Sequence, residues 1–151
     1  LIDVGKNLLI SPGISVVPEA KIIALTGKAN AMHDPTEGGI IGGLQELAAC
    51  SGLSVHVYAD TISELGCTPY FCDALDLDPL GLLASGSLLA CVPSSDEMMI
   101  IDVLTSNGIK ACKIGEMIDI SLGNQITCGG ITTDLPYFER DELARYFSEN
   151  Y

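Results

Sequence analysis

The chain has 151 residues, 48% of them hydrophobic, and its 20 acidic and 7 basic residues give a formal net charge of −13. This length and apolar content suffice for one compact core, so we expect residues 1–151 to form a single domain. No apolar run approaches the roughly 18 residues of a membrane span, and no basic patch is present, so membranes and nucleic acids are poor partners.

The first elements along the chain are short. The apolar run at residues 8–10 ends in a Ser-Pro-Gly turn and fits either a strand or a helix. Residues 14–25 are predicted to form a helix that Ser15 caps and Gly27 ends. The chain opens without an initiator methionine or a signal-peptide pattern, so we expect a piece of a longer, cytoplasmic protein.

Residues 32–47 are the most informative stretch, because they resemble a sharp turn followed by an amphipathic helix. Asp34 is predicted as the N-cap, with Pro35 in the first helical position and Glu37 closing a capping box. Glycine pairs follow at 38–39 and 42–43. A glycine in a helix interior costs about 1 kcal/mol relative to alanine, so the pairs indicate close approach of another backbone or a ligand.

Two interpretations of this turn remain open. In the first, the caps and glycines only let the helix pack tightly. In the second, the N–H groups of Gly38 and Gly39 also hold a phosphate. Carboxylates in the turn repel a phosphate, so Mg²⁺ or basic residues from elsewhere must then supply positive charge, and Lys28 is the only basic residue nearby in sequence. His33 is a candidate acid, base or phosphate donor, or a structural hydrogen-bond donor.

The remaining predicted elements alternate between helices and single strands. The first three are a strand at 53–58 with His56 on the sheet surface, a helix at 69–75 and a buried strand at 87–92. A helix that Ser94 and Glu97 open and Gly108 ends comes next, followed by a strand at 109–114. A hairpin within 123–129 and a helix at 138–147, with Leu143, Tyr146 and Phe147 on one face, complete the chain. Residues 78–87 are a loop whose small side chains would admit another backbone or a ligand. This order predicts an α/β or α+β fold, with a layered mixed sheet of four to six strands packed with helices.

Six cysteines occur without a Cys-x-x-Cys pair or zinc-ribbon spacing. Most lie in apolar segments, and the cysteines are interpreted as buried or inert thiols of a reducing cytosol. Cys67 and Cys72 flank a predicted helix start and are the best candidates for redox chemistry.

The motif Met32-His33-Asp34-Pro35-Thr36-Glu37-Gly38-Gly39, together with residues 77–80, 84–89 and 108–116, resembles the C-terminal domain of the aminoimidazole ribonucleotide (AIR) synthase, or PurM, superfamily. The resemblance spans residues 14–116, with a weaker match at 139–143. The Asp-Pro-Thr-x-Gly-Gly form is most similar to the hydrogenase maturation (HypE) branch and to AIR synthase-related proteins. The HypE branch works through a C-terminal cysteine, whereas the last cysteine here, Cys128, lies well inside the chain.

The resemblance implies a PurM C-terminal-like fold and an ATP-dependent, homodimeric enzyme that activates an amide oxygen, a carbonyl oxygen or a similar acceptor by phosphorylation. It also implies an N-terminal domain with Mg²⁺-binding aspartates, and a nucleotide or substrate phosphate in the cleft between the domains. Asp34, Thr36, Gly38 and Gly39 are then the phosphate-binding residues, and no metal ligand is expected in the chain itself. ATP and Mg²⁺ are expected only together with the N-terminal domain. A non-catalytic assembly or ligand-sensing module with the same fold is the alternative.

Overall fold

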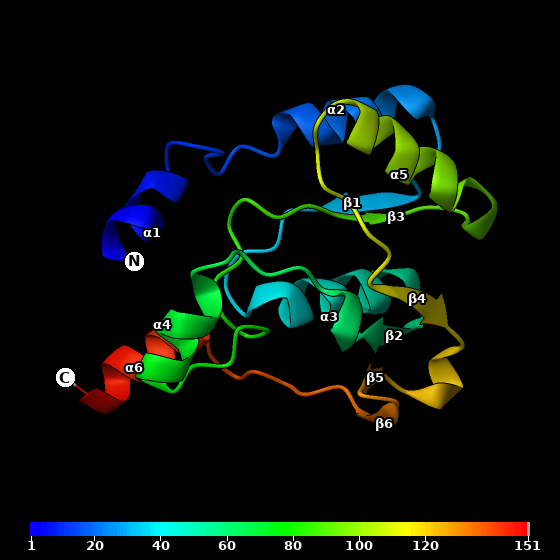
Figure 1. Ribbon diagram of the computed structural model, residues 1–151. Coiled ribbons are helices and arrows are strands. Elements are labelled where there is room, and N and C mark those ends of the chain that lie inside the picture. Colours follow the sequence, from blue (N-terminus) through cyan, green and yellow to red (C-terminus); the bar gives the residue numbers. More distant parts are fainter. Residues whose placement is uncertain (151) are drawn as a thin grey trace.

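A computed structural model describes residues 1–150 (Figure 1). Its helices are α1 (Ile2–Leu8), α2 (Val17–Thr26), α3 (Gly39–Ser51), α4 (Thr68–Leu75), α5 (Glu97–Ser106) and α6 (Glu142–Asn150). Its strands are β1 (Ala31–His33), β2 (Ser54–Tyr58), β3 (Leu89–Cys91), β4 (Gly115–Ile118), β5 (Gln125–Cys128) and β6 (Ile131–Asp134). The predicted mixed α/β class, with four to six strands and packed helices, is confirmed.

The elements stack in layers (Figure 1). Helices α2 and α5 lie on one side of the antiparallel pair β1–β3, and α3 lies on the other side. Beyond α3 is the second sheet, with strand order β4-β2-β5-β6. Both chain ends lie at the end of the molecule that α1, α4 and α6 form.

Strand β2 is the centre of the larger sheet. It pairs antiparallel with β4 and parallel with β5, and β5 continues into β6 through an antiparallel hairpin. Its residues alternate, so that Val55 and Val57 face α3 in the core while His56 is only half-buried. His56 Nε2 lies 2.7 Å from Thr127 Oγ1 on β5, which confirms that this histidine lies on the sheet surface.

Two hydrophobic clusters hold the layers together. The larger joins α3 to the four-stranded sheet and includes Ile41 and Val57, both fully buried. Burying a side chain of this size stabilises the fold by about 1.5–3 kcal/mol. The smaller cluster joins Ile23 of α2 to Ile100 and Leu104 of α5. Strand β3 contributes to both, because Leu89 packs into the larger cluster while its neighbours Leu88 and Val92 pack against the smaller.

Several predicted boundaries and caps are wrong. The strand expected at 87–92 has only three residues, with Ala90 exposed. The strand expected at 109–114 begins at Gly115, because residues 109–114 cross from the smaller cluster to the larger sheet and pairing starts only after that crossing. The expected hairpin lies later, around the left-handed pair Gly129–Gly130.

The predicted helix caps differ as well. Helix α2 has Val16 rather than Ser15 as its N-cap, without a side-chain hydrogen bond, whereas its expected end at Gly27 is confirmed. In place of the capping box at Ser94, a 3₁₀ turn precedes α5. The final helix starts at Glu142 rather than 138, and its apolar residues Leu143 and Phe147 are exposed.

Candidate functional site

The glycine-rich turn begins α3 later than the sequence pattern predicts. The N-cap is Gly38 and the first helical residue is Gly39, without a side-chain cap, so Asp34 and Glu37 do not cap the helix. Pro35 lies before the helix and is fully buried rather than helical. The capping prediction fails because Gly38 and Gly39 both have left-handed backbones, with φ of +78° and +67°, so the helix starts no earlier than Gly39.

Gly39 touches another backbone. A Cβ atom at this position would lie 2.5 Å from the carbonyl oxygen of Leu80 and 2.8 Å from that of Leu82. Only glycine therefore fits. Further along α3, a Cβ at Gly43 would lie 2.7 Å from Pro35 Cβ. The prediction that these glycines permit close approach is confirmed.

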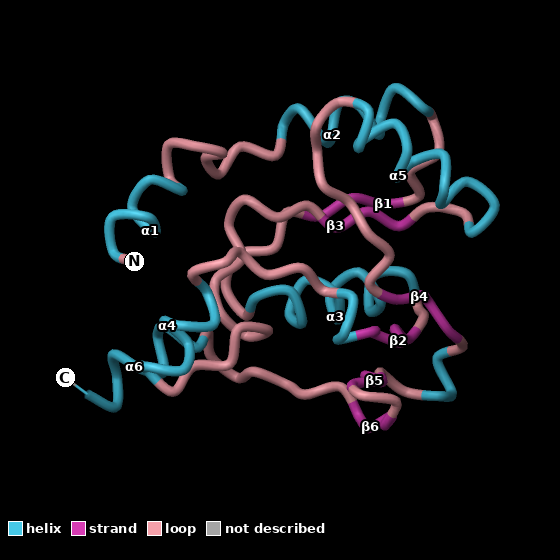
Figure 2. The backbone as a smooth tube through the Cα atoms, in the orientation of Figure 1, coloured by secondary structure: helices cyan, strands magenta, loops and turns pink. Residues whose placement is uncertain are grey.

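Hydrogen bonds join the glycine turn to the loop at residues 78–84. The N–H of Ile41 donates to the carbonyl oxygen of Leu80 at 3.2 Å, and the N–H of Ala84 donates to that of Thr36 at 3.2 Å. Figure 2 shows the loops that connect α4 with β3 and β6 with α6. The 78–84 loop therefore acts as a backbone support for the turn, as its small residues predict.

A carboxylate from the far end of the chain reaches the same turn. The N–H of Gly38 donates to Asp141 Oδ2 at 3.1 Å, and the N–H of Leu143 donates to Asp141 Oδ1 at 2.9 Å. Asp141 is only 8% exposed. One buried carboxylate thus lies at the N-termini of both α3 and α6, where backbone N–H groups and helix dipoles favour negative charge. Sequence reasoning missed this role, although an aspartate directly before a helical segment is an N-cap signal.

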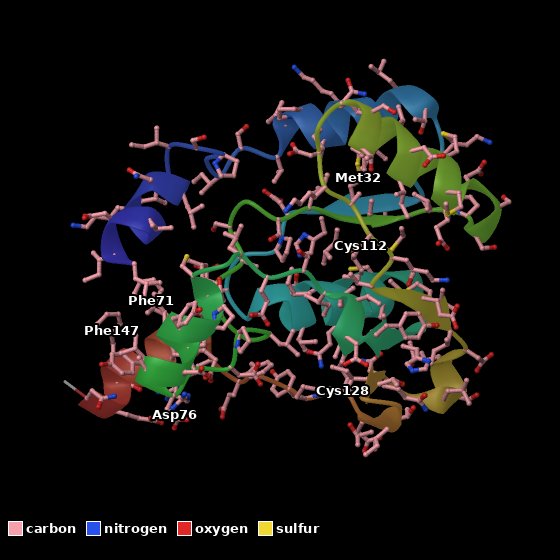
Figure 3. The ribbon with its side chains drawn as sticks, in the orientation of Figure 1. Met32, Phe71, Asp76, Cys112, Cys128 and Phe147 are labelled. Carbon is pink, nitrogen blue, oxygen red and sulfur yellow. The ribbon has the colours of Figure 1, made fainter. Side chains whose placement is uncertain are left out.

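Glu142 and Arg145 fasten α6 beside Asp141. Glu142 Oε2 accepts a hydrogen bond from the N–H of Asp78 at 2.9 Å and lies 2.8 Å from Arg145 Nη2. Arg145 also donates to the carbonyl oxygen of Asp76, at the α4–α6 junction that Figure 3 shows. The hydrogen bond from Arg145 lowers the pKa of Glu142, so both groups are ionised at neutral pH.

The side chains of the turn, which include the predicted phosphate-binding residues Asp34 and Thr36, lie on its outer side. Asp34, Thr36 and Glu37 are all exposed. A hydrogen bond from the Thr36 side chain lowers the pKa of Glu37, which stays ionised. The N–H of Gly39 donates to the carbonyl oxygen of Thr36 at 3.1 Å. Both N–H groups predicted to hold a phosphate therefore already have a partner: that of Gly38 bonds to Asp141, and that of Gly39 bonds to the carbonyl of Thr36.

His33 ends β1 beside α3. Its Nε2 lies 2.7 Å from Glu46 Oε2, and its side chain is 31% exposed. A histidine held by a carboxylate has a fixed orientation, which suits a proton-transfer role and equally a structural one. The nearby cation Lys28 pairs with Asp96 at 3.3 Å, away from the turn.

Within residues 1–150, no three His, Cys, Asp or Glu side chains gather closely enough to hold a metal ion.

All six cysteines are free, and fewer of them are buried than their apolar segments suggest. Only Cys67 and Cys72 are buried, whereas Cys50, Cys112 and Cys128 are exposed. Burial, assisted by nearby carboxylates such as Glu64, raises the pKa of Cys72. A thiol in this setting is a poor nucleophile, which weakens the redox interpretation of the pair.

None of the helices within residues 1–150 has the length and apolar character needed to cross a lipid bilayer.

Known proteins share this fold and part of this sequence. The carbamoyl dehydratase HypE of Cupriavidus necator is 28% identical over 102 residues, which are 66% of this chain and 29% of that protein. The crystal structure of Escherichia coli HypE, a hydrogenase maturation protein, superposes with a TM-score of 0.76 at 22% identity, over 87% of this chain and 42% of that one. A HypE structure in complex with ATP superposes with a TM-score of 0.70 at 27% identity, over 80% of this chain and 39% of that one.

This chain thus spans less than half the length of these proteins. Residues 8–123 match the family described as AIR synthase related protein, C-terminal domain, and so cover most of the chain and the whole glycine-rich turn. The chain belongs to this family.

Proposed function

We propose that this chain is the C-terminal domain of an ATP-dependent, HypE-like enzyme of hydrogenase maturation. In this proposal, the glycine-rich turn forms one side of a site for a nucleotide or a substrate phosphate, and the rest of the polypeptide forms the other. The observation that carries the proposal is the turn itself. Two left-handed glycines, Gly38 half-buried and Gly39 buried, leave the start of a 13-residue helix without side chains, in a chain 27% identical to a HypE whose structure is a complex with ATP.

The charges of the chain support a divided site. The exposed carboxylates of Asp34 and Glu37 repel a bare phosphate, and Lys28 is paired elsewhere. ATP carries Mg²⁺, whose preferred ligands are oxygen atoms, so these carboxylates suit a metal-bound nucleotide better than a free phosphate. In this proposal, as the family resemblance implies, the Mg²⁺ ligands belong to the N-terminal domain.

An exposed apolar surface supports contact with a further domain. No residue of α1 is buried, and large apolar side chains at the start of the chain face solvent. Leu9 is 70% exposed and Ile10 is 83% exposed. Exposed apolar groups of this density mark interaction surfaces. The N-terminal domain of the same polypeptide is the proposed partner, within a cytoplasmic homodimer.

The test uses the full-length polypeptide that carries this chain. Asp34→Asn and Thr36→Val change exposed groups of the turn, so both variants are expected to fold normally. We expect each to reduce Mg²⁺-dependent ATP hydrolysis at least about tenfold, the loss that one interaction of about 1.4 kcal/mol causes. Asp119→Asn, an exposed aspartate in a distant 3₁₀ turn, is the matched control. Unchanged turnover in both site variants, with folding verified by circular dichroism, would refute the site assignment.

A non-catalytic assembly or ligand-sensing module is the second candidate. The observation in its favour is that Asp141 already occupies the N–H of Gly38. Calorimetry that detects ATP binding by the full-length protein, combined with no hydrolysis, would favour this candidate.

A further inference from the structure

We propose that Asp141 is a built-in competitor for the phosphate site, and that ligand binding releases α6. This inference rests on the proposed function, because it concerns the regulation of the same turn. The bond that carries it joins the N–H of Gly38 to Asp141 Oδ2 at 3.1 Å. A phosphate oxygen on this N–H would have to replace the carboxylate.

Charge makes simultaneous occupancy unfavourable. Asp141 is 8% exposed, so its negative charge is poorly screened by water. A phosphate that binds Gly38 while Asp141 stays in place would bring two anions together in a partly buried site, where like charges cost several kcal/mol. Neither Lys28 nor Arg145 offsets this repulsion, because both are engaged with other carboxylates. Departure of Asp141 is therefore coupled to arrival of the phosphate.

The chain before Asp141 is anchored independently. Leu135 is buried in the larger cluster, and Phe138 packs against the same cluster. Phe138 also fills the space that a side chain at Gly81 would need. Glu139 and Arg140 follow in an exposed bend. A movement of α6 can thus pivot at residues 139–140 without disturbing the core.

Helix α6 itself is held by polar groups. Its only buried residue is Glu142, whereas Leu143 is 37% exposed and Phe147 is 53% exposed. The bonds that fasten it to the rest of the chain run from the N–H of Asp78 to Glu142, from the N–H of Glu142 to the carbonyl oxygen of Gly81, and from Arg145 to the carbonyl oxygen of Asp76. Polar contacts of this kind can be exchanged for water when the helix leaves, whereas a buried apolar face could not be exposed so readily. Helix α6 also lies beyond the part of the chain that matches the family, which ends at residue 123.

The test compares ATP binding in three full-length proteins, the wild type, Asp141→Asn and Glu139→Gln, with ATP and Mg²⁺ as the probe. Asparagine is also a good N-cap, so Asp141→Asn removes the charge while the cap of α6 is retained. We expect this variant to bind ATP at least about fivefold more tightly, because the N–H of Gly38 is free to bind a phosphate in a larger fraction of the molecules. Glu139→Gln removes the same charge from an exposed neighbour and should change the affinity less than about twofold.

Hydrogen exchange of the wild type is the second measurement and does not depend on any variant folding. ATP should increase amide exchange in residues 142–150 while exchange in β2 stays constant. Equal ATP affinity in the wild type and Asp141→Asn, with unchanged exchange in α6, would overturn the competitor role and leave the proposed function intact. If none of the three proteins binds ATP, the proposed function fails and the competitor role fails with it.

Discussion

Gly39 and Gly52, which lie at the two ends of α3, have almost the same φ angle in different surroundings. Their φ values are +67° and +66°, but a Cβ at Gly39 would strike the carbonyls of the 78–84 loop, whereas nothing lies within 4 Å of one at Gly52. Gly52→Ala should therefore cost only the conformational strain of about 1–2 kcal/mol. Gly39→Ala adds an overpacking penalty of about 1–3 kcal/mol.

Urea denaturation of the two variants measures the difference directly. The expected order of unfolding free energies is wild type, then Gly52→Ala, then Gly39→Ala. Equal losses in the two variants would mean that the loop moves away from residue 39 at no cost, and the turn would then not be a rigid feature.

At the scale of single residues, the sequence predicted that glycine is needed in the turn, but it did not predict which group each glycine contacts. The unusual pairs at 38–39 and 42–43 correctly indicated close approach. The partners could not be predicted, because Leu80 and Asp141 lie far along the chain and contact the turn only in the folded structure. Local capping rules failed for the same reason, since the carboxylate that reaches the turn belongs to the distant Asp141 and no side chain caps α3.

At the scale of elements, the attachment of α6 depends on the buried carboxylate of Glu142. The pKa of Glu142 is lowered from its ordinary value of 4.5 by Arg145, so the stability it contributes is present above pH 4.5 and is lost as the pH falls below this value. Glu142→Gln should lower the free energy of unfolding by about 1–3 kcal/mol at pH 7, because hydrogen bonds to a buried charge are lost. The difference from the wild type should shrink below pH 4.5.

Glu149→Gln is the matched control for this prediction. Glu149 also lies 2.8 Å from Arg145, but its side chain is 57% exposed. Its loss should cost less than about 0.5 kcal/mol, as exposed ion pairs usually do. Thermal or urea denaturation at pH 7 and pH 4 checks both variants. A cost for Glu149→Gln as large as that for Glu142→Gln would contradict the importance of burial.

Element types were easier to predict than element ends. The period-two pattern of β2 and the end of α2 at Gly27 were correct, because they depend on local sequence. The start of β4 was wrong because apolar residues such as Ile109 and Ile114 face different layers rather than one sheet. The position of α6 was wrong because Phe138 packs as part of a loop.

For the whole molecule, the N-terminal segment contributes little to the core. No residue of α1 is buried, and its described contact with the rest of the chain is the approach of Gly5 to Phe71. Deleting residues 1–12 should therefore lower the free energy of unfolding by less than about 1 kcal/mol. It should also reduce self-association of the isolated chain, because it removes exposed apolar side chains.

Urea denaturation and sedimentation velocity measure these two effects. Deletion of residues 144–150, which removes most of α6, is the comparison and should lower stability more, because the ion pairs of Arg145 are lost. A large loss of stability on removing residues 1–12 would show that α1 belongs to the core rather than to an interface.

The parallel pairing of β2 with β5 has a kinetic consequence. His56 is paired in register with Gln125, so the centre of the larger sheet joins strands 69 residues apart. Contacts this distant in sequence carry a high entropic cost of loop closure and slow folding. During synthesis, Val55 and Val57 can be covered by α3, but one edge of β2 has no partner until β5 has been made. The open strand edge is then a point at which a nascent chain is exposed to aggregation.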